Sequence, residues 1–193
     1  GVQPDIVTFG KGISAGFAIC GTVTSQEIVD KCKGNKGLPW AGTYSNDPLP
    51  AAVALKQLQI VIRENLTEHS ARVGDILEQK LVALQNSHEC IGDVRGHGLY
   101  RMLDIVVDRK SRTANPELAE RIRREAMLEG IVMIAVKNFM RICPPLIVKT
   151  DEIDDIMGRL DTAITRAVSN QTEKIEFSSS SSLAATDKIR SVA

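Results

Sequence analysis

The sequence has 193 residues, of which 43% are apolar and 25% charged, and its 24 Lys and Arg residues balance 24 Asp and Glu residues. This composition is typical of an ordinary globular protein of one or two domains. Because there is no basic excess, the charge argues against a protein whose main ligand is nucleic acid or an anionic membrane. No stretch contains the roughly 18 consecutive apolar residues of a membrane span, so we expect none.

Four cysteines, Cys20, Cys32, Cys90 and Cys143, are spread along the chain without the spacing of a zinc site. We therefore predict no metal site. Cys20 and Cys143 lie inside apolar runs, where they behave as small hydrophobic residues, so we expect a reducing compartment and hence a cytoplasmic location. The first residues have neither an initiator Met nor the basic and apolar segments of a signal peptide. We therefore expect the sequence to start in the middle of a longer protein.

Residues 1–65 predict a unit that does not close a core of its own. The expected elements are strands at 5–9 and 17–24 and helices at 26–31 and 48–65, with a glycine-rich connection at 34–48. Two strands with so little helix cannot enclose an apolar core alone. We therefore predict that this unit is the end of a larger domain.

The pattern after residue 65 predicts an α/β domain at 66–170. Asn115-Pro116 is a typical helix start, Gly130 a typical helix end, and Thr150 precedes an acidic first turn. The expected helices are at 65–84, 115–130 and 150–169, and the expected strands at 90–95, 99–107, 131–136 and 139–142. The Ser-rich residues 171–193 are predicted to be a disordered tail.

Lys11 is the first candidate for a catalytic residue. It lies between Gly10 and Gly12 directly after a predicted strand, so its side chain projects from a strand end, where ligand sites of α/β sheets collect. An amine held there can act as a nucleophile toward an aldehyde. A Gly-Lys-Gly sequence alone is a weak signal, and a solvated loop lysine is the alternative.

Four stretches of the sequence form a collinear set. They are Pro-Asp-Ile-Val-Thr-Phe-Gly-Lys-Gly at 4–12, Gly-Thr-Tyr-Ser-Asn-Asp-Pro-Leu at 42–49, Val-Arg-Gly-His-Gly-Leu at 94–99, and Arg-Ile-Cys-Pro-Pro-Leu-Ile-Val at 141–148, the last followed by an acidic helix start. In this order they resemble segments of the class III aminotransferases, pyridoxal-phosphate enzymes of fold type I. The resemblance covers about residues 1–168.

The resemblance implies roles for three residues. Lys11 would bind pyridoxal phosphate covalently and later move a proton at the substrate. Thr43 would bind the cofactor phosphate, typically that of the neighbouring subunit, through its hydroxyl and backbone N–H. Arg141 would bind a substrate carboxylate through its guanidinium. The alternatives are an ordinary loop residue at Thr43 and a strand-edge salt bridge at Arg141.

The resemblance also implies the architecture and the reaction. Residues 1–65 would end the large pyridoxal-phosphate domain, and 66–170 would form the small C-terminal α/β domain of a homodimer. We predict a transaminase that moves an amino group from an amino acid or amine donor to a keto acid. An aminomutase, a decarboxylating transaminase of the same fold, or a non-catalytic domain that binds a partner subunit are the alternatives. The sequence does not name the donor or the acceptor.

Several parts of the family's site precede the lysine segment. They are the aspartate for the pyridine nitrogen, the aromatic residue that stacks on the ring and the first phosphate-binding loop. Because these residues hold the cofactor and complete its electron sink, we expect residues 1–193 alone to be inactive.

Two short segments depart from the family pattern. Asn46-Asp47 stands where the family usually has Gly-Asn or a similar pair. Tyr100-Arg101-Met102 stands where small or apolar residues are common. We expect these departures to bear on the substrate class more than on the fold.

A basic cluster at Arg121, Arg123 and Arg124 is interpreted as a solvated helix face. Glutamates lie four residues from two of these arginines, at the spacing of neighbours on one side of a helix: Glu117 and Glu125 from Arg121, and Glu120 from Arg124.

Overall fold

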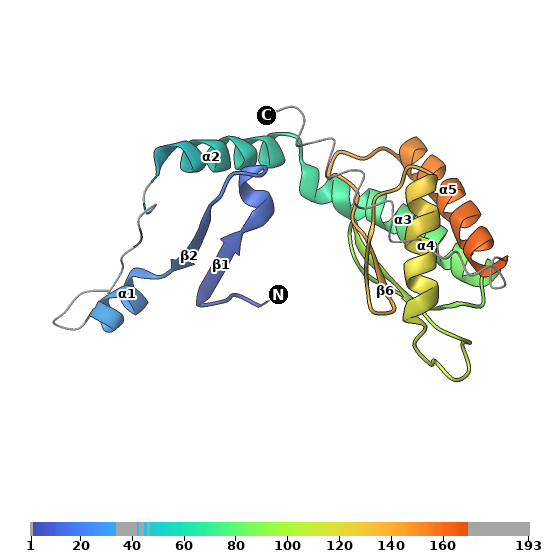
Figure 1. The fold of residues 1–193 in the computed structure, drawn as a ribbon. Coiled ribbons are helices and arrows are strands. Elements are labelled where there is room, and N and C mark those ends of the chain that lie inside the picture. Colours follow the sequence, from blue (N-terminus) through green and yellow to red (C-terminus); the bar gives the residue numbers. More distant parts are fainter. Residues whose placement is uncertain (1, 34–41, 43–44, 46, 170–193) are drawn as a thin grey trace, which may run out of the picture. The chain divides into compact units, whose positions relative to one another are not determined.

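The computed structural model describes residues 2–33, 42, 45 and 47–169. The chain divides into two compact units, Gly1–Ser70 and Ala71–Ala193, which follow one another along the colour bar of Figure 1. The mixed α/β composition expected from the sequence is confirmed. The predicted tail at 171–193 lies outside the described residues.

The first unit is built on a pair of antiparallel strands. β1 (Ile6–Gly10) pairs with β2 (Cys20–Thr24), and Gly10 lies opposite Cys20. A short 3-10 helix, η1 (Lys11–Ser14), follows β1 directly. The second strand is shorter than the expected 17–24. Residues 17–19 have no strand partner because β1 ends at Gly10, so they return the chain to the sheet instead.

Two helices complete the first unit. α1 (Gln26–Lys33) follows β2, and α2 (Pro48–Arg63) packs against η1, as Figure 1 shows. The Asp47 carboxylate caps α2 by accepting a hydrogen bond from the Leu49 backbone N–H at 3.1 Å. Apolar side chains of the strands, of the segment between η1 and β2 and of α2 remain exposed: Ile6, Val7, Phe17, Val23, Leu49, Leu55, Leu58 and Ile62.

The second unit is a four-stranded antiparallel sheet covered by helices. The strand order is β3-β4-β6-β5. The boundary between the two units falls within α3, near its start. The elements are α3 (Leu66–Ser87), β3 (Ile91–His97), β4 (Tyr100–Ile105), α4 (Pro116–Leu128), β5 (Ile134–Val136), β6 (Phe139–Ile142) and α5 (Thr150–Ser169). β5 is shorter than the predicted strand at 131–136, because only three of its residues pair with the hairpin partner β6.

The core lies on one face of this sheet. Leu103 and Ile105 of β4 and Met140 of β6 are fully buried together with apolar residues of α3, α4 and α5. Side chains alternate between the two faces of a strand, so the intervening residues project from the opposite face. That face, called the arginine face below, carries Arg95, Tyr100, Met102, Phe139 and Arg141.

Arg101 is a buried charge at the centre of the second unit. Its side chain is 3% exposed. The guanidinium donates hydrogen bonds to the carbonyl oxygens of Gly98 at 2.9 Å, Gly96 at 3.1 Å and Gly74 at 3.1 Å. It also forms an ion pair with Glu78 at 3.0 Å. One side chain of β4 therefore ties the β3–β4 hairpin to α3.

Glycine permits this close contact. A Cβ at Gly74 would lie 2.3 Å from the Gly98 carbonyl carbon, so only glycine lets α3 approach the hairpin this closely. Gly96 has a φ of 135°, and a Cβ there would lie 2.1 Å from the Tyr100 carbonyl oxygen. The Arg-Gly-x-Gly-Leu segment thus has a packing role as well as a turn role.

Replacing Arg101 by Met should destabilise the second unit strongly. The variant keeps the buried stem but leaves the three carbonyl oxygens without this donor, so we expect a loss of about 3 kcal/mol in the free energy of unfolding. Urea titration followed by circular dichroism measures the change. As a control, Arg124→Met removes an exposed arginine and should cost less than about 1 kcal/mol. Equal losses in the two variants would contradict the role of Arg101.

Candidate active-site residues

Lys11 occupies a strained backbone position at the end of β1. It is the first residue of η1, its side chain is exposed, and its φ is 56°. A left-handed φ is uncommon for a non-glycine residue other than Asn or Asp and costs of order 1–3 kcal/mol. Nothing lies within 4 Å of a Cβ built on Gly12. Lys11 therefore presents an exposed amine directly after the end of β1.

Two hydrogen bonds between Ser14 and Phe17 stabilise the turn that follows Lys11. The Ser14 side chain is fully buried, and its hydroxyl donates a hydrogen bond to the Phe17 carbonyl oxygen. The Phe17 N–H donates in return to the Ser14 carbonyl oxygen at 3.1 Å. The sequence analysis did not single out Ser14. The available signal was a polar residue within the short glycine-containing connection between two strands.

Arg141 lies on the arginine face in β6. It pairs in register with Met102 of β4 and Ile134 of β5. The carbon at the centre of its guanidinium lies 6.0 Å from the centroid of the Tyr100 ring. Among the described residues, no carboxylate lies within ion-pair distance of Arg141, so the strand-edge salt bridge considered above is not found there. Its charge is available to an anionic ligand.

Arg95 lies on the same face but differs from Arg141 in its charged neighbours. Its guanidinium lies 5.1 Å from the Phe139 ring centroid, but Asp93 and Asp104 lie 3.7 Å and 3.9 Å from it. Two carboxylates therefore offset its charge. Both guanidinium groups lie over aromatic rings. Of the two arginines, only Arg141 lacks a carboxylate partner within the described part of the chain.

The predicted site residues do not all fall within the described part of the chain. Lys11 belongs to the first unit and Arg141 to the second. Thr43 lies outside the described residues, so its predicted role at a phosphate stays a prediction. Arg101, which the sequence analysis linked to the substrate, is on the core side of its strand and has a structural role.

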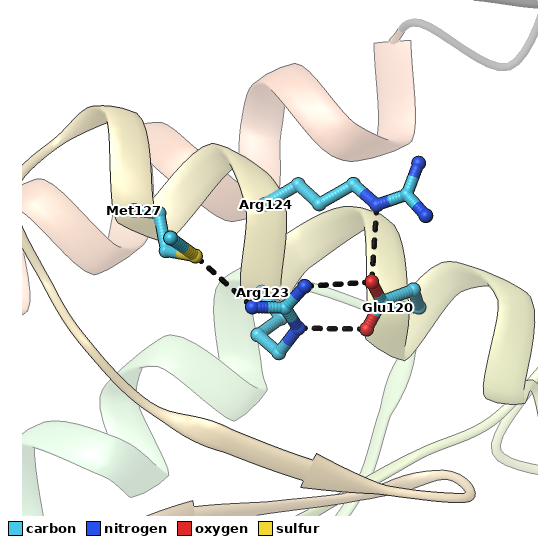
Figure 2. A network of polar contacts seen from close by, with 4 residues as sticks. All are labelled: Glu120, Arg123, Arg124 and Met127. Atoms are coloured by element: carbon cyan, nitrogen blue, oxygen red, sulfur yellow. Dashed lines mark hydrogen bonds and ion pairs between the residues drawn. The ribbon is translucent and has the colours of Figure 1, made fainter. Parts of the chain in front are cut away.

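The basic cluster on α4 is held by a single carboxylate. Glu120 accepts two hydrogen bonds from Arg123, at 2.7 Å and 2.8 Å, and one from Arg124 at 3.0 Å, as Figure 2 shows. Mainly the hydrogen bonds from Arg123 lower the pKa of Glu120 to about 2. Among the described residues, Arg121 makes neither of its two expected ion pairs. Of the expected ion pairs, the one between Glu120 and Arg124 is found, and Arg123 binds the same carboxylate.

The pKa values of two other groups are shifted by their immediate surroundings. Burial raises the pKa of the Cys90 thiol, and hydrogen bonds from Ser111 lower the pKa of Asp108. Within the described ranges, no group of three or more His, Cys, Asp or Glu side chains could hold a metal ion. Among the same residues, no helix is both long enough and apolar enough to cross a membrane.

Comparison with known proteins identifies the family. The model of the aminotransferase class-III family matches residues 1–164. The chain belongs to the class III aminotransferases. The resemblance drawn from the four sequence segments is thereby confirmed, and these segments now fall within one matched region.

Two curated relatives illustrate the range of this family. The chain is 37% identical over 169 residues to "Ethanolamine-phosphate phospho-lyase homolog 1" of Caenorhabditis elegans, covering 86% of this chain and 36% of that protein. It is 33% identical over 178 residues to "Taurine--pyruvate aminotransferase" of Bilophila wadsworthia, covering 85% of this chain and 39% of that protein. The chain thus spans less than two fifths of the length of either relative.

Solved transaminase structures share the fold of this class III chain. A transaminase from the marine bacterium Virgibacillus aligns with a TM-score of 0.82 at 30% identity, covering 88% of this chain and 40% of that one. An (S)-enantioselective omega-transaminase from Thermomicrobium roseum aligns with a TM-score of 0.79 at 32% identity, covering 86% and 38%. The expected fold class is confirmed.

Glu120→Gln should change the acid stability of the chain by a small amount. The folded pKa of about 2 lies below the ordinary value of 4.5. The stabilisation is therefore full above pH 4.5 and is lost as the pH falls toward 2. Because the Glu120 side chain is partly exposed, we expect a loss below about 1 kcal/mol at neutral pH that vanishes near pH 2. Thermal unfolding across this pH range measures it.

Glu125→Gln provides the control for this prediction. Glu125 lies on the same helix, and the described residues give it no ion pair. Its variant should keep the pH profile of the parent chain. If both variants show the same pH profile, the Glu120 network does not contribute to acid stability.

Proposed function

We propose that the protein containing these residues is a pyridoxal-phosphate-dependent transaminase, which moves an amino group from an amino acid or amine to a keto acid. Lys11 carries this proposal, because the class III match includes its segment and its strained turn presents an exposed amine. Membership of the family supports the reaction class. The identity of the donor and acceptor depends on residues beyond this chain.

The residues around Lys11 fit the covalent cofactor that the family implies. A primary amine is the group that reacts with the cofactor aldehyde, and the space beside Gly12 is open. Pyridoxal phosphate, when bound, supplies an electron sink for charge that develops at the substrate α-carbon. Lys11 would hold the cofactor between turnovers, and its freed amine would take the proton from the substrate α-carbon and pass it to the cofactor carbon that had carried the lysine.

The remaining assignments complete the proposal. Arg141 binds the carboxylate of the substrate through the N–H groups of its guanidinium. Thr43 binds the cofactor phosphate, in a homodimer whose sites lie at the subunit interface. Residues 1–65 are the end of the large domain, whose other segments cover the exposed apolar residues of β1, β2 and α2. Residues 66–170 are the small domain, and the protein is cytoplasmic.

A second candidate reaction is the elimination of phosphate from an amino-alcohol phosphate. The 37% identical relative named as a phospho-lyase homolog favours it. Both reactions use the same lysine, so this chain's own site residues are compatible with either. Release of inorganic phosphate from ethanolamine phosphate without keto-acid consumption would identify elimination, whereas stoichiometric formation of a new amino acid would identify transamination.

Reduction with borohydride should attach the cofactor to Lys11. The experiment uses a chimera that joins residues 1–193 to the N-terminal region of a class III relative. After incubation with pyridoxal phosphate and reduction, peptide mass spectrometry should find the label on the peptide that contains Lys11. Lys11→Arg should abolish the label, since a guanidinium does not react with the aldehyde under these conditions.

Lys56→Arg is the matched control for this labelling. Lys56 is an exposed lysine on α2 in the same unit, and its variant should be labelled like the parent. Label on another lysine in the parent chimera would overturn the assignment of Lys11.

A polypeptide of residues 1–193 alone should neither retain pyridoxal phosphate nor transaminate. Without the ring-stacking and phosphate-binding residues that the family places upstream, Lys11 lacks the contacts that make cofactor binding strong. Dialysis after loading, followed by absorbance and by assay with common amino donors, tests this expectation. Retained cofactor absorbance together with keto-acid formation would show that these residues suffice.

A further inference from the structure

The guanidinium of Arg141 lies over the ring of Tyr100 at cation–π distance. Tyr100 is the first residue of β4 and is 50% exposed. Arg141 is paired with Met102, two residues further along β4. Tyr100 and Met102 project from the same face, so the Arg141 side chain turns diagonally toward the ring, at 6.0 Å from its centroid. This diagonal contact joins two strands that the chain separates by about forty residues.

We propose that Tyr100 is a positioning residue that holds Arg141 ready to bind a substrate carboxylate. The proposal rests on the proposed function, because it takes Arg141 as the carboxylate receptor. It adds a determinant of substrate affinity at a position where this chain departs from the family pattern.

The geometry of stacking explains why such a contact favours carboxylate binding. An aromatic ring attracts the flat face of a guanidinium through its quadrupole. All N–H donors of the guanidinium lie in its plane, so a ring on one face leaves the edge free for a two-pronged contact with a carboxylate. A stacked arginine also has fewer rotamers to lose when the ligand binds.

The strand that carries Tyr100 is fixed from the other side of the sheet. The next residue, Arg101, is buried and bonds to the carbonyl oxygens of Gly96, Gly98 and Gly74. Tyr100 itself pairs with His97 in the hairpin. The ring therefore projects from a backbone segment that is held by both the sheet and α3, which makes it a firm support for Arg141.

The second arginine of this face provides an internal comparison. The Arg95 guanidinium lies over the Phe139 ring at 5.1 Å from its centroid, but Asp93 and Asp104 lie within 4 Å of it. Stacking alone therefore does not distinguish the two arginines. Tyr100 and Arg141 combine stacking with an absence of carboxylate partners among the described residues, which is the state suited to an anionic ligand.

The first test observes the contact directly in the 193-residue chain. Arginine side-chain Nε–Hε signals are recorded by nitrogen-15 NMR, and Arg141→Gln identifies the signal of Arg141. Tyr100→Leu should move this signal to the position of a solvated arginine, because the ring-current shift is lost, whereas Tyr100→Phe should retain it. Phe139→Leu is the control and should move the Arg95 signal instead. An Arg141 signal unaffected by Tyr100→Leu would overturn the proposal.

The second test measures function in the chimera described above. Tyr100→Leu should raise KM for the keto acid about three- to tenfold with little change in kcat, and Tyr100→Phe should stay within about twofold of the parent. The effect of Tyr100→Leu should disappear in an Arg141→Gln background. If Arg141→Gln leaves KM unchanged, the proposed carboxylate receptor is wrong. If only Arg141→Gln raises KM, the positioning role of Tyr100 is wrong and the proposed function stands.

Discussion

The buried guanidinium of Arg101 is the constraint on which the second unit depends. Its bonds to Gly74, Gly96 and Gly98 join α3 to the β3–β4 hairpin, and its charge is compensated by Glu78. A buried charge is costly unless all its donors are used, so this arrangement tolerates little displacement. Because Arg101 points toward the core, its neighbour Tyr100 must point to the opposite face of the sheet. The core interaction thereby sets the geometry of the arginine face.

The charged groups of the chain differ in how completely they are compensated. Glu120 takes hydrogen bonds from Arg123 and Arg124, and Arg95 has two carboxylates nearby. These groups serve stability and solubility, with small contributions because they are exposed. Arg141 has an aromatic ring but, within the described part of the chain, no acid. Arg141 is therefore a candidate binding residue because, among the described residues, it lacks a neighbouring carboxylate, whereas an ordinary surface arginine such as Arg95 has two.

The two candidate site residues belong to different units of one class III chain. Lys11 is held by a strained turn at the end of β1, and Arg141 by the register of β6 with β4 and β5. The two curated relatives described above are named as a phospho-lyase homolog and as an aminotransferase. A shared fold therefore does not fix the reaction. The reaction of this protein depends on the groups that surround the lysine and the substrate.

Local chemistry let the sequence predict most elements and the position of the candidate residue Lys11 at a strand end. Asn115 and Pro116 start α4, Thr150 starts α5, and the glycine-flanked Lys11 follows β1, because caps, turns and strand ends depend on a few adjacent residues. Only the tertiary structure decided the strand order, the burial of Arg101 and the contact of Tyr100 with Arg141. These features join residues tens of positions apart, and a sequence does not state which distant side chains share a face until the strands are paired.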